Sequence, residues 1–395
     1  MKPPNLKPSA RRPVLEAHRA YKMASSTQAF VRGGTAKFYE WLAEQPNSGI
    51  PHGPTIWICG DCHTGNLGPV ADAKGRVEIQ IRDFDQTVIG NPAYDLIRLG
   101  LSLCTTARSS DLSGVTSAKM LEQMLIGYTN AFGHQHYKGE QRPEVVRLVM
   151  KKAIHRSWKK MAKKQIQDEK PTNPLGQNFW VLARNERAAV ERLFEQKDTQ
   201  KLVTMLRSRP DNAPIEVLDA AYWMKGCSSL GFLRIAVLLQ VGKKTKNDLC
   251  LIDVKQAISP IAPVELRSGM PRNNAARVVE GARHLSPFLG ERMLGSKLIG
   301  RDIFLRELMP QDLKLNIESL SSEDAMKTAR FLAGVVGMAH ARQMDAGTRK
   351  NLVKELNSKT TKTLDAPSWL WSNVVDLIAY HEKAYLEHCR RYALK

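Results

Sequence analysis

The sequence predicts an α+β protein, in which a small β-rich unit of roughly residues 225–310 lies between two mainly helical segments. In the helical segments, apolar residues recur at three- and four-residue steps, which is the period of an amphipathic helix. In the β-rich unit, short apolar runs alternate with polar, glycine-containing turns. The predicted division of the chain is 1–222 for the first helical segment, 223–318 for the β-rich segment and 319–395 for C-terminal helices that return to the first segment.

Length and charge limit the possible functions before any motif is considered. A chain of 395 residues is too long to be one small binding module. Its 59 Lys and Arg against 39 Asp and Glu give a formal charge of +20, which favours phosphate-bearing partners. Six cysteines do not make a disulfide scaffold, and the basic start lacks the apolar core of a signal peptide. We therefore expect a cytoplasmic protein without a membrane span.

The N-terminal part of the chain combines helices with two short strands. A helical pattern runs from about Val14 to Glu44 and is interrupted by Gly33-Gly34. A Pro/Gly-rich loop follows at 46–54. The apolar runs at 55–59 and 77–81 predict strands that flank the turn-rich segment GDCHTGNLGPVADAKG.

The rest of the first segment is predicted to be helical. Leu96, Leu99 and Leu103 give helical spacing between Tyr94 and about Phe132. Residues 142–170 predict a basic amphipathic helix, and further helical stretches are expected around 186–207 and 215–223. The basic helix carries eight cations without an acidic residue among them: Arg147, Lys151, Lys152, Arg156, Lys159, Lys160, Lys163 and Lys164.

The pattern changes near Trp223. A glycine-containing turn precedes two strands that are separated by the polar turn GKKTKND. A helix over NNAARVVEGARHL and a strand over KLIGRDIFLREL complete the β-rich unit. The chain then ends in helices at 321–343 and 367–392.

The turn-rich segment after residue 59 permits three chemical interpretations. Cys59-Gly60-Asp61-Cys62-His63 matches the CxxCH haem-attachment pattern, but that chemistry requires an exported chain, which the start of the sequence does not predict. Asp61 and His63 also match the D-x-H start of a two-metal phosphoesterase. The later Gly90-Asn91-Pro92 lacks the histidine that such a site would add, so this second interpretation is incomplete.

The third interpretation is phosphoryl transfer. Asp61 and Asn66 stand five residues apart, which is the D-x-x-x-x-N spacing of a kinase catalytic loop. In that chemistry a carboxylate orients the attacking hydroxyl, and an amide oxygen binds magnesium. Asp83-Phe84-Asp85 follows the next strand, where a second carboxylate would bind metal at the phosphates. The structural alternative is a turn in which the Asp and Asn side chains cap backbone groups.

The other parts of a phosphoryl-transfer site have candidates only late in the chain. A run from Gly226 to Gly231 offers a glycine loop, Lys255 ends the strand LCLIDV, and Glu280 lies on the next helix. There is no GxxxxGK[ST] phosphate loop. Each candidate has a plain structural alternative: a hairpin turn, a solvated strand-end lysine and a surface glutamate.

Taken together, the runs KMASSTQAFVRGG (22–34), GDCHTGNLG (60–68) and RDFDQTVIGNPAYDLIRLGLSL (82–103) resemble a bacterial family called domain of unknown function 2252. Five later runs follow in the family order: KGCSSLGFLRIAVLL, LIDVKQAISP, RVVEGARHL, FLRELMPQDLKLNIE and GMAHARQMD. The resemblance extends from about residue 14 to 345. That family is grouped with the protein-kinase-like superfamily, near the aminoglycoside phosphotransferases.

The resemblance implies a role for each matching residue. Asp61 takes the place of the catalytic aspartate, with His63 beside it to order the loop. The metal places fall on Asn66, Asp83 and Asp85. The implied nucleotide-binding residues are Gly226, Ser228, Ser229 and Gly231 of the glycine loop, Lys255 for the phosphates, and Glu280 as the partner of Lys255. Asp95 is implied to buttress the catalytic loop.

Two departures from the kinase pattern stand out. The histidine that usually precedes Gly-Asp is Cys59 here. The catalytic and metal loops also precede the glycine loop and the lysine, which reverses the kinase order. A circular permutation would reconcile this order with the fold. The resemblance then implies a permuted, two-lobed, protein-kinase-like fold, in which the helix at 321–343 normally runs into the catalytic loop.

The expected function is that of an enzyme, a kinase-like phosphotransferase that uses ATP or another nucleoside triphosphate and Mg²⁺. Its acceptor is an unidentified hydroxyl compound, and the basic surplus is compatible with an anionic one. Two alternatives stay open: a nucleotide-binding regulator with little catalysis, and a nucleic-acid-binding protein that uses the basic helix at 142–164.

Overall fold

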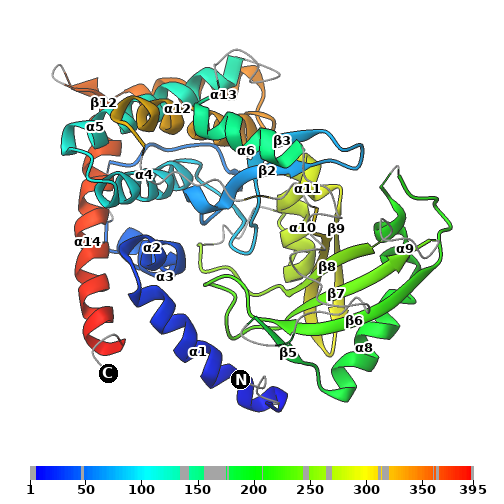
Figure 1. The fold of residues 1–395 in the computed structure, drawn as a ribbon. Helices are drawn as coiled ribbons and strands as arrows, with labels where there is room; N and C mark the ends of the chain where they lie inside the picture. The colour runs from blue at the N-terminus through cyan, green and yellow to red at the C-terminus, as the bar shows by residue number, and fades with distance from the viewer. Residues whose placement is uncertain are drawn as a thin grey trace.

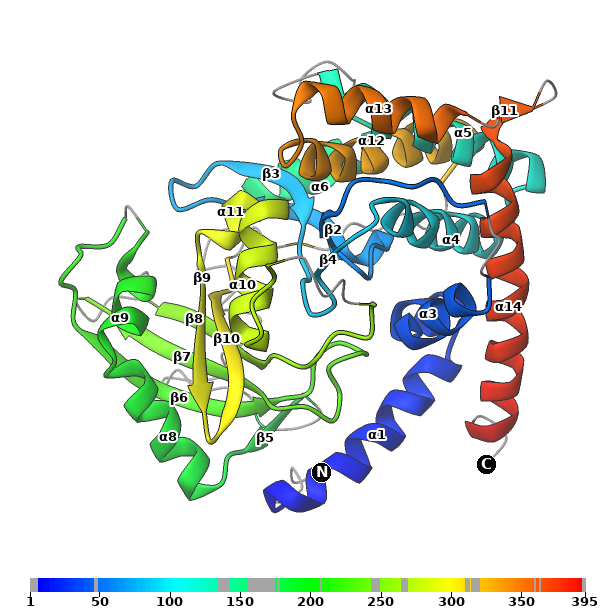
Figure 2. The ribbon, with the colours of Figure 1, turned by 180° about the vertical axis from the view of Figure 1, so that it is seen from behind.

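The computed structural model confirms an α+β molecule with a small antiparallel sheet and a mainly helical part. It describes residues 6–45, 49–133, 142–154, 175, 178–206, 208–242, 249–263, 269–309, 313, 320–358, 360–361 and 364–392. We call the described residues between 178 and 309 the sheet part, and the rest the helical part. The two parts lie side by side, and both ends of the chain are at the same end of the molecule (Figures 1 and 2).

The helical part is built from both ends of the chain. The expected break at Gly33-Gly34 is confirmed, since α2 ends at Gly33 and α3 begins at Thr35. The helices of this part are α1 Pro8–Ala24, α2 Thr27–Gly33, α3 Thr35–Ala43, α4 Ala93–Ser109, α5 Gly114–Asn130, α6 Glu144–Ile154, α12 Ser322–Ala341, α13 Ala346–Asn357 and α14 Ser368–Tyr392.

Helices α5 and α12 pack closely against each other in the helical part. A Cβ atom added at Gly127 of α5 would lie only 2.0 Å from the backbone oxygen of Arg330 in α12. The missing side chain therefore lets the two backbones touch. Tyr128, one residue later, hydrogen-bonds His340 near the end of α12 at 2.8 Å, so the same crossing fixes the end of α12.

Short strand pairs carry the turn-rich segment. The strands expected at 55–59 and 77–81 are confirmed as β1 Ile56–Ile58 and β3 Val77–Ile81. Each pairs with a strand that the sequence did not indicate: β1 with β4 Val88–Gly90, and β3 with β2 Leu67–Ala71. A single turn of 3-10 helix, Thr64–Asn66, joins the loop after β1 to β2. A further small pair consists of β11 Thr360–Thr361 and β12 Leu364–Pro367.

The sheet part contains six antiparallel strands in the order β5-β6-β7-β8-β10-β9. Their bounds are β5 Phe179–Val181, β6 Ile215–Trp223, β7 Arg234–Val241, β8 Leu249–Gln256, β9 Met293–Leu298 and β10 Arg301–Glu307. The helix expected at 215–223 is wrong, because this segment is β6, paired along its length with β7. The sheet therefore extends to the N-terminal side of residue 223.

Four helices accompany the sheet: α8 Arg184–Phe194, α9 Lys197–Thr204, α10 Asn274–Leu285 and α11 Pro287–Gly290. Successive side chains of a strand point to opposite faces, and β8 uses this alternation. Ile252 and Val254 join the apolar core that also contains Val190 of α8. Asp253 and Lys255 therefore lie on the other face of the sheet, which α10 and the helical part adjoin (Figure 1).

Candidate functional site

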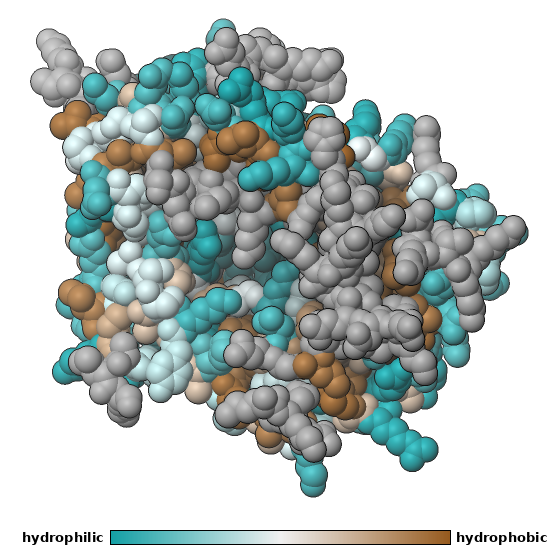
Figure 3. Space-filling view, viewed as in Figure 1, coloured by the Kyte–Doolittle hydropathy of each residue, from teal (hydrophilic) through white to brown (hydrophobic). Residues whose placement is uncertain are grey.

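A cleft of about 220 Å³ lies where the two parts meet. Figure 3 shows a hollow near the middle of this face, bordered mainly by hydrophilic side chains. Of the residues that the sequence singled out, the cleft is lined by Asp61, His63, Asn66, Asp83, Asp85, Ser228, Ser229 and Lys255. These residues come from four separate stretches of the chain, so the fold brings together what the sequence keeps apart.

A buried carboxylate holds the loop that carries Asp61. Asp95, in the first turn of α4, accepts hydrogen bonds from the backbone N–H groups of Cys59 at 2.7 Å and Gly60 at 3.0 Å. His340 of α12 contacts the same carboxylate at 3.2 Å. From α3, the Tyr39 hydroxyl donates to the Gly60 carbonyl oxygen at 2.7 Å. The geometry therefore matches the buttressing role expected for Asp95.

The charge of Asp61 is balanced by Arg98, which the sequence did not single out. Oδ1 of Asp61 accepts from Nε of Arg98 at 3.0 Å and lies 2.9 Å from Nη2. Arg98 also donates to the carbonyl oxygen of Val31 at the end of α2. The contacts of Arg98 are with Oδ1, whereas Oδ2 of Asp61 lies 3.7 Å from Nε2 of His63.

His63 is a neutral side chain that orders the loop. Its Nδ1 accepts a hydrogen bond from the Gly65 N–H at 3.1 Å, so the ring proton is on Nε2. Burial lowers the pKa of His63 to about 4, although the neighbouring Asp61 charge opposes this shift. A pKa this far below neutral leaves the His63 ring uncharged at neutral pH.

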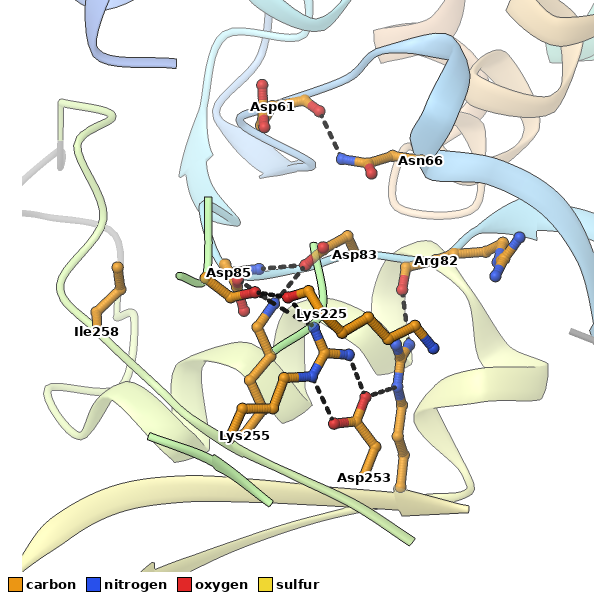
Figure 4. A network of polar contacts seen from close by, with 12 residues as sticks. Asp61, Asn66, Arg82, Asp83, Asp85, Lys225, Asp253, Lys255 and Ile258 are labelled. Atoms are coloured by element: carbon orange, nitrogen blue, oxygen red, sulfur yellow. Dashed lines mark hydrogen bonds and ion pairs between the residues drawn. The ribbon is translucent and has the colours of Figure 1, made fainter. Parts of the chain in front are cut away.

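Asn66 presents an amide oxygen to the cleft. Its Nδ2 donates to the backbone oxygen of Asp61 at 3.0 Å, as Figure 4 shows. With the amino group committed in this way, Oδ1 is the atom left for a ligand. The segment from Asp61 to Asn66 is thus a turn closed by this hydrogen bond, and Oδ1 of Asn66 remains as an acceptor.

Asp83, Asp85 and Lys255 form one charged cluster on the opposite side of the cleft (Figure 4). Nζ of Lys255 pairs with Asp85 and lies 3.4 Å from Oδ1 of Asp83. Burial raises the pKa of Asp85, and the nearby negative charge of Asp83 raises it further, so its net shift is upward despite Lys255. Burial acts in the same direction on Asp83, but the charges of Lys255, Arg306 and Arg234 outweigh it and lower the pKa of Asp83.

The side chain of Asp83 is 35% exposed, whereas that of Asp85 is 12% exposed and its Oδ1 has no hydrogen-bond partner. The pKa is therefore lowered for the more exposed carboxylate and raised for the buried one, which is the partner of Lys255.

The structure does not form the expected ion pair between Lys255 and Glu280. Glu280 lies on α10, as expected, but its side chain is 38% exposed and pairs with Arg283 and His284 at 3.3 Å each. The side chain of α10 that reaches the site is Arg277, one turn earlier. Arg277 donates to the backbone oxygens of Asp85, Thr87 and Ile258, and so ties the Asp83–Asp85 turn to the end of β8.

The glycine loop lies between β6 and β7, as its sequence indicates. Gly226 and Gly231 have φ angles of 89° and 98°, which favour glycine. Neither glycine lines the cleft, whereas Ser228 and Ser229 do. Ser229 is fixed by its Oγ, which donates to the Lys225 carbonyl oxygen at 2.7 Å. Lys22 of α1 donates to the Gly226 carbonyl oxygen at 2.7 Å, so the helical part contacts this loop directly.

A second buried ion pair lies beside the glycine loop, since its arginine, Arg234, also donates to the Lys225 carbonyl oxygen. Arg234 of β7 forms two hydrogen bonds with Asp253 of β8, at 2.8 and 2.6 Å. Next to them Lys225 stacks over the Trp223 ring at 4.1 Å. Burial lowers the pKa of Lys225 to about 7, although the Asp253 charge opposes the shift. Lys225 therefore titrates near neutral pH.

The residues present suit magnesium better than haem or a two-metal cluster. Within the described part of the chain no group of three or more His, Cys, Asp and Glu side chains could hold a metal by itself. Asp83 and Asn66 offer oxygen donors, and Mg²⁺ is commonly held by one or two such groups together with substrate phosphates. Cys59 and Cys62 are buried, and burial contributes to the raised pKa of each thiol.

The basic helix falls only partly within the described residues. Its described portion is α6, where Arg147, Lys151 and Lys152 are exposed. Its remaining cations (Arg156, Lys159, Lys160, Lys163 and Lys164) lie outside the described residues.

Several residues that shape the cleft were missed by the sequence analysis. Arg98 follows Asp95 by three residues and therefore shares its helix face, and Arg277 precedes Glu280 by the same interval. These three-residue spacings were the only local features that could have pointed to Arg98 and Arg277. Arg19 and Thr35 line the cleft directly, and nothing local in the sequence marks them.

Comparison with known proteins gives a family without a described activity. None of the described helices is long and apolar enough to cross a membrane. No curated protein and no solved structure matches the chain. The profile of a family described as "Uncharacterized protein conserved in bacteria (DUF2252)" matches residues 11–391. This match covers nearly the whole chain, and the protein therefore belongs to the DUF2252 family.

Proposed function

We propose that this protein is an ATP- and magnesium-dependent phosphotransferase with a circularly permuted, protein-kinase-like fold, acting on a hydroxyl acceptor. The observation that carries the proposal is the convergence of Asp61, Asn66, Asp83 and Lys255 on one cleft, next to Ser228 and Ser229 of a glycine loop. These are the parts that kinase-type phosphoryl transfer requires. A Lys255 distant from Asp83 would have refuted the permutation, and the two are 3.4 Å apart.

The connectivity also supports the permutation. Gln343, just after α12, makes two hydrogen bonds with the backbone of Trp57 in β1, at 2.8 and 3.0 Å. The end of α12 is thus joined to the strand that leads into the Asp61 loop, although 286 residues separate Trp57 and Gln343 in sequence. In the sheet part, the glycine loop, the Lys255 strand and α10 follow each other in the order used by kinases.

The proposed roles follow from the side-chain environments. Lys255 contacts the triphosphate after exchanging Asp85 for phosphate oxygens, and the Gly226–Gly231 loop covers the same group. Asp83 and Asn66 would hold Mg²⁺, which supplies positive charge against the phosphates. Asp61, oriented by Arg98, accepts the proton of the acceptor hydroxyl through Oδ2.

The transfer step is a displacement at the γ-phosphorus. The acceptor oxygen forms a bond to that phosphorus while the bond to the bridging oxygen of ADP breaks. The acceptor proton moves to Asp61, and the leaving electron pair stays on ADP. Positioning and charge neutralisation supply most of the acceleration in such reactions, which suits a cleft assembled from preset ion pairs.

One observation favours a second candidate, a nucleotide-binding regulator with little catalysis. Both groups that would act on the substrate are already engaged, Asp61 by Arg98 and Lys255 by Asp85. If these pairs persist with nucleotide bound, the cleft would bind without transferring.

The test compares wild type with Asp61→Asn in two assays, release of phosphate from ATP with water as acceptor, and binding of a non-hydrolysable ATP analogue with Mg²⁺. We expect turnover to fall about 100-fold or more, because the general base is lost, while nucleotide affinity is retained. Asp345→Asn is the matched control, since Asp345 caps α13 and asparagine caps equally well. Full turnover in Asp61→Asn would exclude the proposed role, and binding without turnover in wild type would favour the regulator.

A further inference from the structure

Three residues between positions 19 and 35 line the cleft but have no role in the function proposed above. Arg19, Gly33 and Thr35 border the same cleft as Asp61 and Lys255. They belong to α1 and to the junction between α2 and α3, in the helical part. The nucleotide-binding groups proposed above, apart from Asn66 and the aspartates, come from the sheet part. The cleft therefore has a second wall with its own polar groups.

Thr35 is nearly buried at the edge of the cleft, and its hydroxyl has no partner among the described residues. Its exposed fraction is 4%, it lines the cleft, and its side chain makes no hydrogen bond with any described residue. A buried hydroxyl that lacks a partner is costly unless a ligand or water satisfies it. Because Thr35 opens onto the cleft, a bound ligand can supply the missing partner.

The same position is the start of a helix. α3 begins at Thr35 after Gly34, no side chain caps its N-terminus, and its first turn contains no acidic residue. The first backbone N–H groups of a helix have no intrahelical acceptor, and the helix dipole favours negative charge there. The uncapped end of α3 and the Thr35 hydroxyl therefore offer donors to an anion at one place.

Arg19 adds positive charge that no carboxylate of the described residues neutralises. Its Nη2 donates to the Gly33 carbonyl oxygen at 3.2 Å, and it forms no ion pair within the described part of the chain. Arg19 as a residue is half-buried, and its guanidinium has further N–H groups that a ligand could accept from. Arginine suits planar or tetrahedral oxyanions because its N–H groups bind two oxygens at once.

This wall is tied directly to the proposed catalytic residue. Arg98 bridges Asp61 and the Val31 carbonyl oxygen of α2. Tyr39, one turn into α3, donates to the Gly60 carbonyl oxygen at 2.7 Å. Because Arg98 balances the charge of Asp61, an anion nearby is not repelled by an unpaired carboxylate.

We infer that the acceptor carries an oxyanion, a phosphate ester or a carboxylate, which binds to Arg19, the Thr35 hydroxyl and the N-terminus of α3 while the acceptor hydroxyl faces Asp61. The assignment of this anion to the acceptor rests on the proposed function. The site itself does not, because its donors are present whether or not nucleotide binds.

The probes are inorganic phosphate and acetate, titrated calorimetrically over the millimolar range with and without Mg²⁺ and a non-hydrolysable ATP analogue. We expect saturable binding that persists with nucleotide bound. Thr35→Val and Arg19→Met should each weaken it about tenfold, because each removes a donor to a charged group. Tighter binding of phosphate indicates a phosphate ester as acceptor, and tighter binding of acetate a carboxylate.

Two control variants separate a binding role from a structural one. Thr199, in α9, is also buried with an unpartnered hydroxyl, so Thr199→Val repeats the chemistry of Thr35→Val away from the cleft. Arg12→Met removes an exposed charge from α1. Both controls should leave anion binding unchanged. Thr35→Val should unfold at the same urea concentration as wild type or a higher one, because it keeps the shape and removes a polar group.

Three results would overturn the inference. The first is that wild type binds neither phosphate nor acetate. The second is that Thr35→Val and Arg19→Met leave the binding intact. The third is competition between phosphate and the ATP analogue, which would place the anion in the nucleotide site. Failure of the nucleotide to bind at all would instead refute the proposed function, and the titrations without nucleotide would still test the anion site.

Discussion

Individual side chains in the cleft are held by neighbours that neutralise or orient them. Asp61 is balanced by Arg98, Asn66 is turned by the Asp61 backbone, and Lys255 is shared by Asp83 and Asp85. The loop spacings made Asp61, Asn66 and Asp83 predictable, because these residues are close in sequence and their geometry is local. The partners Arg98 and Arg277 come from helices whose rotation depends on tertiary packing, so the sequence did not identify them.

Glu280 illustrates this limit. Its helix was predicted, but the turn of α10 that reaches the site carries Arg277, and Glu280 pairs along its own helix with His284. The position that a paired glutamate would take beside Lys255 is occupied by Asp85, from the metal loop. The spacing of apolar residues predicts that α10 is a helix. Which face of α10 meets the cleft is set by tertiary packing, such as that of Gly281 against Thr87.

The buried His63 predicts a pH-dependent stability. Its pKa falls from the ordinary 6.5 to about 4 in the folded protein because burial disfavours the charged ring. Between these values the unfolded chain binds the extra proton, so the free energy of unfolding decreases as the pH falls through this window. The difference amounts to about 3 kcal/mol at and below pH 4.

Urea unfolding at pH 7 and pH 4.5 checks this prediction. His63→Asn keeps an acceptor for the Gly65 N–H but cannot titrate, so it should lose about 2–3 kcal/mol less than wild type between the two pH values. The exposed His18→Asn on α1 serves as control and should behave as wild type does. Equal losses in wild type and His63→Asn would show that His63 does not titrate as its burial implies.

At the scale of elements, the site depends on three connections: the loop after β1, the turn after β3 and the loop between β6 and β7. The strands β1 and β3 were predictable from their apolar runs. β6 was mistaken for a helix, because the Ala-rich Ile215–Trp223 segment lacks clean alternation and only its pairing with β7 defines it as a strand. In this segment the hydrogen bonds between β6 and β7 decide the structure, and the local helix propensity does not.

Substitution of a glycine in the glycine loop should weaken nucleotide binding as well as strain the backbone. Gly226 has a φ of 89°, so Gly226→Ala should lower the free energy of unfolding by about 1–2 kcal/mol. It should also weaken ATP-analogue binding, because its added Cβ would lie 2.7 Å from Oγ of Ser229, which lines the cleft. Gly75→Ala is the matched control, with a φ of 83° and open space around the position. Equal nucleotide affinity in both variants would remove the loop from the binding site.

At the scale of the whole molecule, α1 joins the two parts that form the cleft. Arg11 pairs with the buried Glu186 of α8 at 2.8 Å, and Leu15 packs into the core of the sheet part. The other end of α1 meets α14, where His388 contacts the Ala20 carbonyl oxygen at 2.8 Å. Figure 1 shows α1 running from α2 and α3 toward the sheet part. The fold class was predictable from helical and strand periodicity, whereas this bridging was not, because residue 11 gives no local sign of a partner at residue 186.

The bridge predicts a difference between two neighbouring arginines. Arg11→Met should lower the free energy of unfolding by about 3 kcal/mol, because it leaves Glu186 buried without its cation. Arg12→Met should cost less than about 1 kcal/mol, since its pair with Glu16 is exposed. Urea denaturation measures both. Equal costs would mean that α1 does not hold the two parts together through Arg11.

The most direct test of the proposed phosphoryl-transfer cleft is calorimetric titration of the protein with a non-hydrolysable ATP analogue, with and without Mg²⁺. We predict saturable, magnesium-dependent binding that Lys255→Met weakens about tenfold or more, because a buried cation facing the phosphates is lost. Lys297→Met, an exposed position on β9 of the same sheet, should leave that binding unchanged. No saturable binding by wild type, or an affinity that Lys255→Met does not alter, would contradict the account.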